Sequence, residues 1–308
     1  MNMEEYTVLV FMSTYNGEKY LNEQVQTILD QKNVNIRLFI RDDGSQDGTL
    51  NILKHYAQRY NNIHVIEGEN IGFAVSFLKL IYDGHYERAN YYAFSDQDDI
   101  WDEDKMISGI RLMKEHGEPM FYYCAQRIVD NKGTYLRDET CFEKVQKYSK
   151  YSASVVPLTR GCTQMWNDSF HEILLSQHPD INEIYSHDFW ISLIAFWKAD
   201  MVYDSIPHMG YRQTGSNVSG AYKNRLGRLR YMYRKAVVIA KDSCHIREKA
   251  AKQLEQILDG EEKCSLLTAC YRDNFLKKIE LLFSVKYKKG LLLRWKLFTI
   301  ILIICNRL

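Results

Sequence analysis

YYAFSDQDDIW, residues 91–101, places three carboxylates within four positions directly after an apolar, aromatic run. The run at 91–94 has the β-propensity and the length of a buried strand. Open α/β sheets bind ligands at the carboxyl ends of their strands, so Asp96, Asp98 and Asp99 are expected to line a crevice. Hard cations prefer oxygen ligands and complete their shell with water and substrate phosphates. The stretch therefore predicts a site for Mg²⁺ or Mn²⁺ beside a diphosphate.

A structural interpretation of the same stretch stays open. Asp99 or Asp102 would cap a helix that begins near Glu103, and the other acids would be solvated first-turn residues favoured by the helix dipole. The acidic stretch alone does not decide between a metal site and a helix start.

The residues before this stretch alternate between strand and helix patterns. Apolar runs at 7–12, 36–40 and 63–66 predict strands, and 50–60 and 75–82 predict helices. A further helix after residue 17 has one apolar face, formed by Leu21, Val25, Ile28 and Leu29. Strands that alternate with helices indicate an α/β fold with a mostly parallel sheet covered on both faces.

Polar motifs follow four successive predicted strands. They are Ser-Thr-Tyr-Asn-Gly at 13–17, Asp-Asp-Gly-Ser-x-Asp-Gly-Thr at 42–49, Asn-Ile-Gly at 70–72 and Asp-Gln-Asp-Asp at 96–99. Together these motifs resemble the catalytic domain of glycosyltransferase family 2. The resemblance covers about residues 5 to 220. It implies a GT-A fold, with a Rossmann-like sheet, and an inverting transferase that uses a nucleotide-diphosphate-sugar donor.

The resemblance also implies which residues bind the donor: Thr14, Tyr15, Asn16, Asp42, Gly72, Asp96 and Arg212. Asp42 would accept a hydrogen bond from the imide N3 of a pyrimidine, because an ionised carboxylate is only an acceptor. The alternative for Asp42 and Asp43 is an Asx-turn that supports Gly44, which is expected more of Asp43 than of Asp42. Asp96 would contact the ribose.

By the same resemblance, Asp98 would hold the metal that bridges the donor phosphates. A cation there stabilises the transition state, because negative charge develops on the departing diphosphate. Asp99 would position Asp98 without contacting the metal itself, or it would cap the following helix.

A general base is expected in Ser-His-Asp-Phe-Trp at 186–190, which precedes an apolar helix over 191–197. Asp188 matches the family's second acidic motif and would remove the proton of the acceptor hydroxyl. The alternative is a capping acid worth roughly 1 kcal/mol of helix stability. His187 would orient this acid or lie on the surface.

A third polar cluster spans 210–220 and resembles the tyrosine-arginine-glutamine segment of bacterial rhamnosyltransferase-like members. Arg212 could pair with the donor phosphates, with Gln213 beside it. A histidine often follows the glutamine in such members, whereas this chain has Thr214, so His208 is a candidate to compensate. The loop Arg-Gly-Cys-Thr at 160–163 resembles the family's acceptor-side loop. The seven cysteines have no metal-site spacing and are interpreted as reduced, non-catalytic thiols.

The C-terminal part differs sharply in charge. Residues 221–308 hold 20 Lys/Arg against 8 Asp/Glu, although the net charge of the chain is only +1. We therefore expect two domains: a catalytic domain at 1–220 and a basic helical extension at 221–308. The apolar run 297–305 is too short to span a membrane and predicts a helix that binds an anionic membrane surface. The alternative is a helix packed on the catalytic domain or in a homodimer seam. Nucleic acid is not expected as a partner.

These features predict a transferase at the cytoplasmic, inner face of the cell membrane, since the N-terminus enters a strand at once without a signal peptide. It would add one sugar, with dTDP-rhamnose as the expected donor, to a lipid-linked or polysaccharide acceptor. A UDP-hexose donor (galactose, glucose or galactofuranose) and a non-catalytic partner subunit stay open as alternatives. A sugar nucleotidyltransferase is disfavoured because residues 13–18 do not form a glycine-rich, basic loop.

Overall fold

The computed structural model describes residues 6–140, 159–214, 253, 254 and 256. The chain divides into two compact units, the first from 1–143, 159–181 and 186–217 and the second from 144–158, 182–185 and 218–308. Almost all described residues belong to the first unit. The expected basic extension and its apolar tail lie outside the described residues, so the division at residue 220 stays a prediction.

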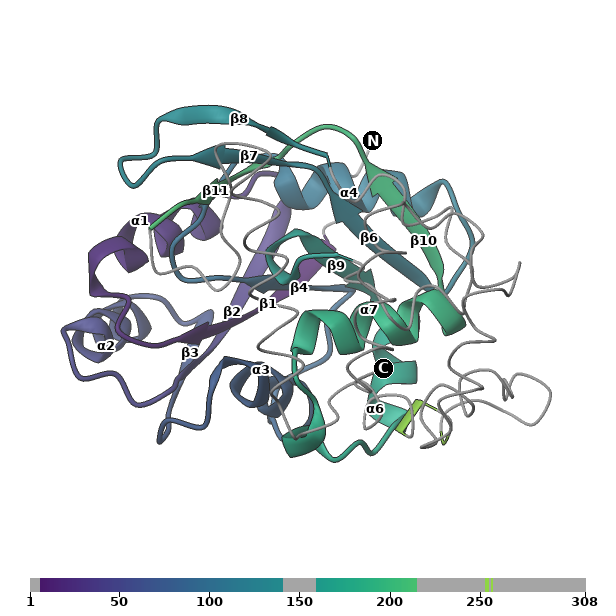
Figure 1. The fold of residues 1–308 in the computed structure, drawn as a ribbon, viewed down its shortest axis with the longest axis horizontal. Helices are drawn as coiled ribbons and strands as arrows, with labels where there is room; N and C mark the ends of the chain where they lie inside the picture. The colour runs from purple at the N-terminus through teal and green to yellow at the C-terminus, as the bar shows by residue number, and fades with distance from the viewer. Residues whose placement is uncertain (1–5, 141–158, 215–252, 255, 257–308) are drawn as a thin grey trace, which may run out of the picture. The chain divides into compact units, whose positions relative to one another are not determined.

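A seven-stranded sheet forms the centre of the first unit (Figure 1). Neighbouring strands run parallel, except that β9 is antiparallel to both β4 and β6. In spatial order the strands are β10 (Asp200–Asp204), β6 (Met120–Cys124), β9 (Gln164–Asn167), β4 (Tyr91–Ser95), β1 (Tyr6–Thr14), β2 (Val34–Asp42) and β3 (Ile63–Glu67).

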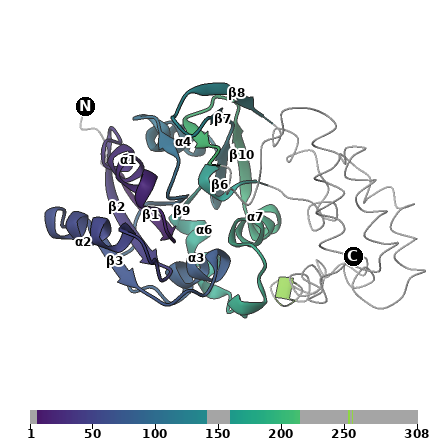
Figure 2. The ribbon, with the colours of Figure 1, turned by 60° about the vertical axis from the view of Figure 1, so that its left-hand side comes forward.

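Helices cover both faces of this sheet (Figures 1 and 2). One face carries α3 (Phe73–Tyr82), α6 (Asp168–Ser176) and α7 (His187–Lys198), and α7 contacts both of the others. The other face carries α1 (Glu18–Leu29), α2 (Thr49–Arg59) and α4 (Lys105–Lys114). Two short 3₁₀ turns, η2 (Gly161–Thr163) and η3 (Ile181–Glu183), precede β9 and α7 respectively.

The core confirms the strands and helices expected from the apolar runs. Val8, Val10, Phe11 and Met12 of β1 are fully buried, because a central strand has helices above and below it. Leu21, Val25 and Ile28 of α1 are buried at the expected helical spacing. The sequence therefore predicts the parallel part of the sheet, whereas β9 is an addition that no local pattern indicated.

A second sheet of four strands follows the acidic stretch. Its order is β5 (Ile100–Trp101), β11 (Met209–Arg212), β7 (Gln126–Val129) and β8 (Tyr135–Glu139). Directly after Asp99 the chain forms β5, which pairs with β11. The helix α4 therefore begins only at Lys105, with Asp104 as its N-cap residue. The expectation that Asp99 or Asp102 caps a helix beginning near Glu103 is therefore wrong.

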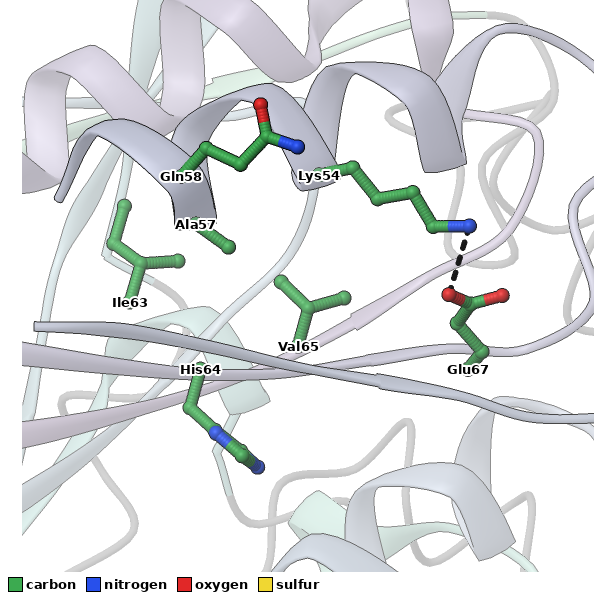
Figure 3. Close-up of a pocket in the computed structure, with 7 residues that line it drawn as sticks. All are labelled: Lys54, Ala57, Gln58, Ile63, His64, Val65 and Glu67. Atoms are coloured by element: carbon green, nitrogen blue, oxygen red, sulfur yellow. Dashed lines mark ion pairs between the residues drawn. The ribbon is translucent and has the colours of Figure 1, made fainter. Parts of the chain in front are cut away.

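A hollow of about 320 Å³ lies between α2 and the edge strand β3 (Figure 3). An ion pair of 2.8 Å between Lys54 and Glu67 crosses its rim. None of the expected site residues lines it, since β1 and β2 separate β3 from the strand that carries the acids.

Within the part of the chain that the structure describes, no helix has both the length and the apolar character needed to cross a membrane.

Candidate active site

The loops that follow β1, β2 and β4 are bound to one another at the carboxyl edge of the sheet. The Tyr15 backbone N–H donates to Oε1 of Gln97 at 2.8 Å, and Nε2 of Gln97 donates back to the Tyr15 carbonyl at 3.0 Å. The Asn16 N–H donates to the hydroxyl of Ser45 at 2.9 Å. Three motifs that lie far apart in the sequence therefore form one surface, which includes Tyr15 and Asn16.

Asp42 ends β2 and is almost fully buried. Its carboxylate accepts hydrogen bonds from Oγ1 of Thr14 at 2.8 Å and from the backbone N–H and hydroxyl of Ser45 at 2.9 and 2.6 Å. A carboxylate has about four acceptor positions, so these three donors leave room for one more. The turn expected of Asp43 is thus made by Asp42, which nevertheless keeps capacity for a ligand N–H.

Asp43 has a different task from the one expected. It forms a buried ion pair with Arg41, and it accepts the backbone N–H groups of Ile71 at 3.0 Å and Gly72 at 2.9 Å. Gly72 has φ +87°, a conformation that side chains other than glycine rarely adopt. Asp43 therefore fixes the loop before α3 rather than its own turn.

The acidic stretch meets a cysteine that is distant in sequence. Asp96, Asp99 and Cys162 each offer a donor atom, and these atoms lie within 4.8 Å of one another. Asp98 is not in this group, so its role as the metal ligand stays a prediction. Asp99 is fully buried, and its Oδ1 accepts the backbone N–H of Arg212 at 3.3 Å. Its other oxygen, Oδ2, has no hydrogen-bond partner among the described residues.

Burial makes this carboxylate cluster costly to ionise. Desolvation, followed by repulsion from Asp98 and Asp188, raises the pKa of Asp96 to about 7. Desolvation also raises the pKa of Asp98 to about 6, although Arg212 opposes the rise. The pKa of Asp99 lies well above its usual range for the same reason, with added repulsion from Asp96 and Asp98. A divalent cation would relieve this repulsion, so the residues fit Mg²⁺ or Mn²⁺.

Asp188 lies in the first turn of α7, where three groups orient its carboxylate. Oδ1 accepts the Ser186 hydroxyl and the Phe189 N–H, the latter at 2.7 Å, while Oδ2 accepts the Gly161 N–H at 3.3 Å and no second donor among the described residues. The charge of Asp188 contributes to the raised pKa of Asp96, so the two carboxylates lie within electrostatic range of each other. Of the two oxygens of Asp188, Oδ2 therefore has the greater capacity to accept a proton.

His187 is buried and not a surface residue. Its ring stacks on Phe77 with 4.0 Å between centroids, and neither ring nitrogen has a partner among the described residues. Desolvation lowers its pKa to about 4, so the imidazole is neutral at physiological pH. A Cβ at position 161 would lie 2.7 Å from Nε2 of His187, which explains the glycine there.

Arg212 is buried behind the acidic loop. Its guanidinium pairs with Glu23, donates from Nε to the Asp98 carbonyl at 2.8 Å, and lies 4.7 Å from the Tyr20 ring centroid. A contact with donor phosphates stays a prediction, and it would require Arg212 to exchange these partners.

Comparisons with known proteins agree with this geometry. A family model described as glycosyl transferase family 2 matches residues 9–174. The chain is also 31% identical over 248 residues to the dTDP-rhamnosyl transferase RfbG of Shigella flexneri, covering 73% of this chain and 82% of that protein. The chain belongs to glycosyl transferase family 2. The predicted resemblance to a rhamnosyltransferase-like member is thereby confirmed.

Other relatives of this glycosyltransferase match over shorter regions. It is 38% identical over 132 residues to the putative teichuronic acid biosynthesis glycosyltransferase TuaG of Bacillus subtilis, covering 42% of this chain and 50% of that protein. Two solved structures share its fold. The mannosyltransferase PcManGT of Pyrobaculum calidifontis, in complex with GDP-Man and Mn²⁺, gives a TM-score of 0.53 at 15% identity and covers 98% and 86% of the two chains.

The second structure, S. aureus TarS 1-349 in complex with UDP-GlcNAc, gives a TM-score of 0.54 at 16% identity, with coverage of 98% and 89%. Both neighbours have the GT-A fold, so the predicted fold class is confirmed.

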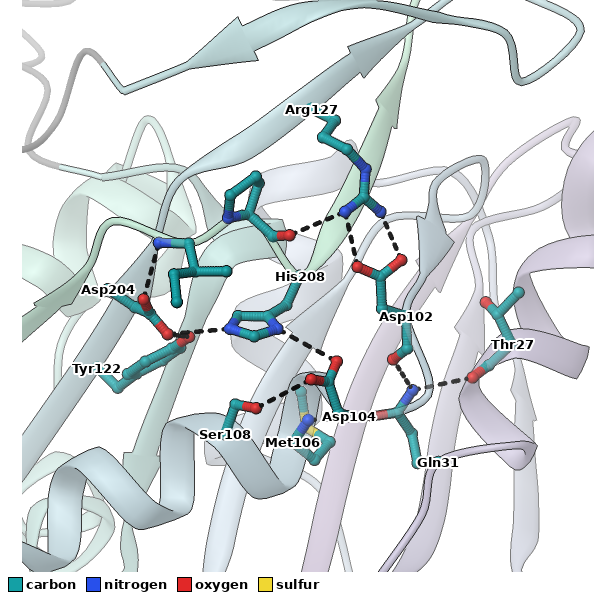
Figure 4. A network of polar contacts seen from close by, with 12 residues as sticks. Thr27, Gln31, Asp102, Asp104, Met106, Ser108, Tyr122, Arg127, Asp204 and His208 are labelled. Atoms are coloured by element: carbon teal, nitrogen blue, oxygen red, sulfur yellow. Dashed lines mark hydrogen bonds and ion pairs between the residues drawn. The ribbon is translucent and has the colours of Figure 1, made fainter.

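His208 of the glycosyltransferase lies in a separate polar network with Asp104 and Asp204 (Figure 4). Its Nδ1 lies 3.2 Å from Asp104, and its Nε2 lies 3.1 Å from Asp204. Both ring nitrogens are thus engaged, so that compensation by His208 for the missing histidine at 214 stays a prediction and would require an exchange of these partners. Gln213 is half-buried, and its backbone N–H donates to the Val129 carbonyl at 2.9 Å.

Sequence reasoning missed three residues near the cluster. Cys162 approaches it from η2. The neighbouring Arg160 pairs with Glu139 at 2.8 Å and opposes the rise in the pKa of Asp96. Lys105 is buried, with Nζ 3.6 Å from the Trp101 ring centroid, and burial lowers its pKa. The one signal in the sequence was that Arg160 and Cys162 flank Gly161, in the loop that resembles the family's acceptor-side loop.

Proposed function

We propose that this glycosyltransferase moves one sugar, with inversion, from dTDP-rhamnose to a lipid-linked or polysaccharide acceptor in cell-surface glycan synthesis. The proposal rests on one observation: Asp188, whose Oδ2 accepts a single hydrogen bond among the described residues, lies within electrostatic range of the carboxylates after β4. The identity with a dTDP-rhamnosyl transferase supports the choice of donor.

On the donor side, the nucleotide would lie over the loops after β1 and β2. Thr14, Tyr15, Asn16 and Gly72 would form its walls, and the remaining acceptor position of Asp42 would take the N3–H of the base. Tyr15 is 44% exposed, so its ring is available for such a contact. Asp96 would bind the ribose.

Asp98, with Asp96 and Asp99 beside it, would hold Mg²⁺ or Mn²⁺. The cation, when bound, would offset the negative charge that develops on the leaving diphosphate. The raised pKa values of Asp96 and Asp98 support this assignment, because in the absence of a cation the protein bears their repulsion.

On the acceptor side, Asp188 would act as the general base. Its Oδ2 would take the proton of the acceptor hydroxyl while that oxygen attacks the anomeric carbon. The bond between that carbon and the diphosphate oxygen breaks, and the electron pair leaves with the diphosphate. Ser186, Gly161 and the Phe189 N–H would keep the carboxylate aimed, and general-base catalysis of this kind contributes about 10²–10⁴-fold.

A panel of donors tests this proposal. The purified chain would be incubated with dTDP-rhamnose, UDP-galactose, UDP-glucose and UDP-galactofuranose, each with candidate acceptors and Mn²⁺, and the released nucleoside diphosphate would be quantified. Release of dTDP alone is expected. Release of UDP alone would replace rhamnose by a hexose donor, and binding without any release would favour a non-catalytic partner subunit.

We also propose that the protein works as a peripheral enzyme on the cytoplasmic face of the cell membrane. The basic and apolar tail supports this, since several charges at about 1 kcal/mol each make attachment to anionic lipids appreciable. Removal of residues 291–308 should release the protein from membranes, and unchanged sedimentation with membranes would contradict the proposal.

A further inference from the structure

Cys162 brings a sulfur atom into the carboxylate cluster. The turn η2 places it there, and this turn is fixed because the Thr163 N–H and hydroxyl both donate to the Arg160 carbonyl, at 3.0 and 2.8 Å. Cys162 is buried, and its donor atom lies within 4.8 Å of those of Asp96 and Asp99. Cysteine is thus the third potential ligand of the cluster, supplied by a segment more than sixty positions further along the chain.

A second observation indicates that this cluster is built for a ligand. Oδ2 of the fully buried Asp99 accepts no N–H or O–H group among the described residues, while its other oxygen accepts the backbone N–H of Arg212. The side-chain partner of this carboxylate is the thiol of Cys162, which is only a weak donor. A buried carboxylate oxygen with so weak a partner is costly, and the cost is removed when a cation binds it. Gln126, 3.9 Å from the sulfur of Cys162, is a weak competitor for that thiol.

We propose that Asp96, Asp99 and Cys162 form a mixed oxygen and sulfur site that captures a thiophilic divalent cation such as Cd²⁺ or Zn²⁺. On binding, the Cys162 S–H bond breaks, the proton passes to solvent, and the sulfur donates an electron pair to the cation. Two carboxylates and one thiolate suit these ions, whereas Mg²⁺ gains little from sulfur. The three donors leave further coordination positions for water.

The other acidic group with suitable spacing differs in this respect. Asp102, Asp104 and His208 also lie within 4.8 Å of one another. However, Asp102 is paired with Arg127 at 2.7 Å. The two ring nitrogens of His208 are also in contact with carboxylates, Nδ1 with Asp104 and Nε2 with Asp204. The acids of that group are therefore paired with protein side chains, and none of its atoms is a buried polar atom without a partner among the described residues.

The inference shares the crevice of the proposed function and predicts that Cd²⁺ or Zn²⁺ inhibits transfer by occupying the place of Mn²⁺. Binding itself is independent of any donor sugar. It can therefore be tested on the full chain, stripped of metal, without a nucleotide sugar.

The experiment is a titration with Cd²⁺ that follows the ultraviolet thiolate-to-metal charge-transfer band. Cys162→Ser is the test variant, and Cys124→Ser is the matched control because Cys124 is equally buried but outside the cluster. Wild type and Cys124→Ser should show a tight band that saturates at a single equivalent. Cys162→Ser should lose it, with Cd²⁺ binding weakened at least about tenfold.

Asp99→Asn provides a second variant in case Cys162→Ser folds poorly. It keeps the thiol and should weaken the same Cd²⁺ band, and excess Mn²⁺ should displace Cd²⁺ from wild type. The inference is overturned if both variants bind Cd²⁺ as tightly as wild type.

The two proposals fail in different ways. Loss of the band in Cys162→Ser without any donor binding to wild type would leave the metal site standing and refute the transferase. An unchanged band in Cys162→Ser together with sugar transfer by wild type would refute the metal site and leave the transferase standing.

Discussion

Two groups of acidic side chains flank β5, and they differ in whether the protein supplies their counter-charges. The first, before β5, contains Asp96, Asp98 and Asp99, and burial raises the pKa of each. The second contains Asp102, Asp104 and Asp204, and it is bound by Arg127 and His208. Although burial opposes it, the hydrogen bond from His208 lowers the pKa of Asp204.

The difference separates a structural network from the proposed ligand site. Acids that are paired by protein cations hold elements together, here α4, β7 and the segments around β10 and β11 (Figure 4). Acids left in mutual repulsion at the edge of a sheet are candidates for binding a charged ligand. Residue type and spacing alone do not separate the two groups, since all of their members except Asp204 fall within nine positions of the sequence at 96–104.

The largest expected effect comes from a comparison of Asp188, the proposed general base, with Asp204 of the paired group. Asp188→Asn should reduce sugar transfer by about 10²–10⁴-fold, because an amide cannot accept the acceptor's proton. Donor binding should stay nearly unchanged. Asp204→Asn, in the paired network, should transfer sugar within a few-fold of wild type. Steady-state rates and donor titrations of both variants check this, and retained transfer in Asp188→Asn would exclude Asp188 as the base.

A smaller effect concerns stabilisation by metal. Mn²⁺ at 100 times its dissociation constant should stabilise wild type by about 2.7 kcal/mol. Asp99→Asn should lose most of this gain, whereas His208→Gln should keep it, because His208 belongs to the paired group. Thermal melts with and without Mn²⁺ measure the difference. An equal gain in all three proteins would place the ion elsewhere.

Removal of His208 tests the paired group itself. His208→Ala should lower the free energy of unfolding by about 1–3 kcal/mol, because the buried Asp204 carboxylate loses a donor. Urea unfolding of the variant and wild type gives the value. Sugar transfer by the folded variant should be retained, and a loss of transfer in proportion to the loss of stability would link the two groups.

The smallest effect is a pH dependence of opposite sign in the two groups. The folded pKa values of Asp96 and Asp98, about 7 and about 6, exceed the value near 4 of an unfolded aspartate. The folded protein therefore holds more protons than the unfolded chain between about pH 4 and 7, and this group lowers stability as pH rises through that range. For Asp204, with its lowered pKa, the contribution is present at neutral pH and is lost only in acid.

Metal-free Asp96→Asn should thus have the same Tm as wild type near pH 4 and a higher Tm near pH 8, by about 2–4 °C for each kcal/mol relieved. His208 also has a raised pKa, because its hydrogen bonds to Asp204 and Asp104 outweigh desolvation, and its stabilising contribution also falls as pH rises. The comparison between variant and wild type removes that shared part. A difference that does not depend on pH would contradict the raised pKa values.

The sequence predicted the parallel sheet and the position of Asp188 because these depend on local patterns. Residues 8–12 are apolar throughout, and Asp188 lies in the first turn of a mainly apolar helix. The pairing of β9 between β4 and β6 could not be predicted, since three short apolar segments carry no information about which pairs with which. The same holds for the second sheet.

Long-range contacts also supply partners that the sequence could not indicate. Arg212 and His208 have the same appearance in the sequence as ligand-binding residues, but their partners Glu23 and Asp204 meet them only in the fold. Cys162 appears unremarkable because its carboxylate neighbours lie far back in the chain. These distant partners decide which carboxylates have their negative charge balanced by a protein cation.

The most direct test of the central claim is a calorimetric titration of the full chain with dTDP, UDP and GDP and their sugar conjugates, with and without Mn²⁺. The site described above predicts tight binding of a pyrimidine conjugate, dTDP-rhamnose, that requires Mn²⁺ and is weakened in Asp42→Asn and Asp98→Asn. Binding that is independent of Mn²⁺, or no binding of any conjugate, would contradict the claim that the uncompensated carboxylates are a donor site.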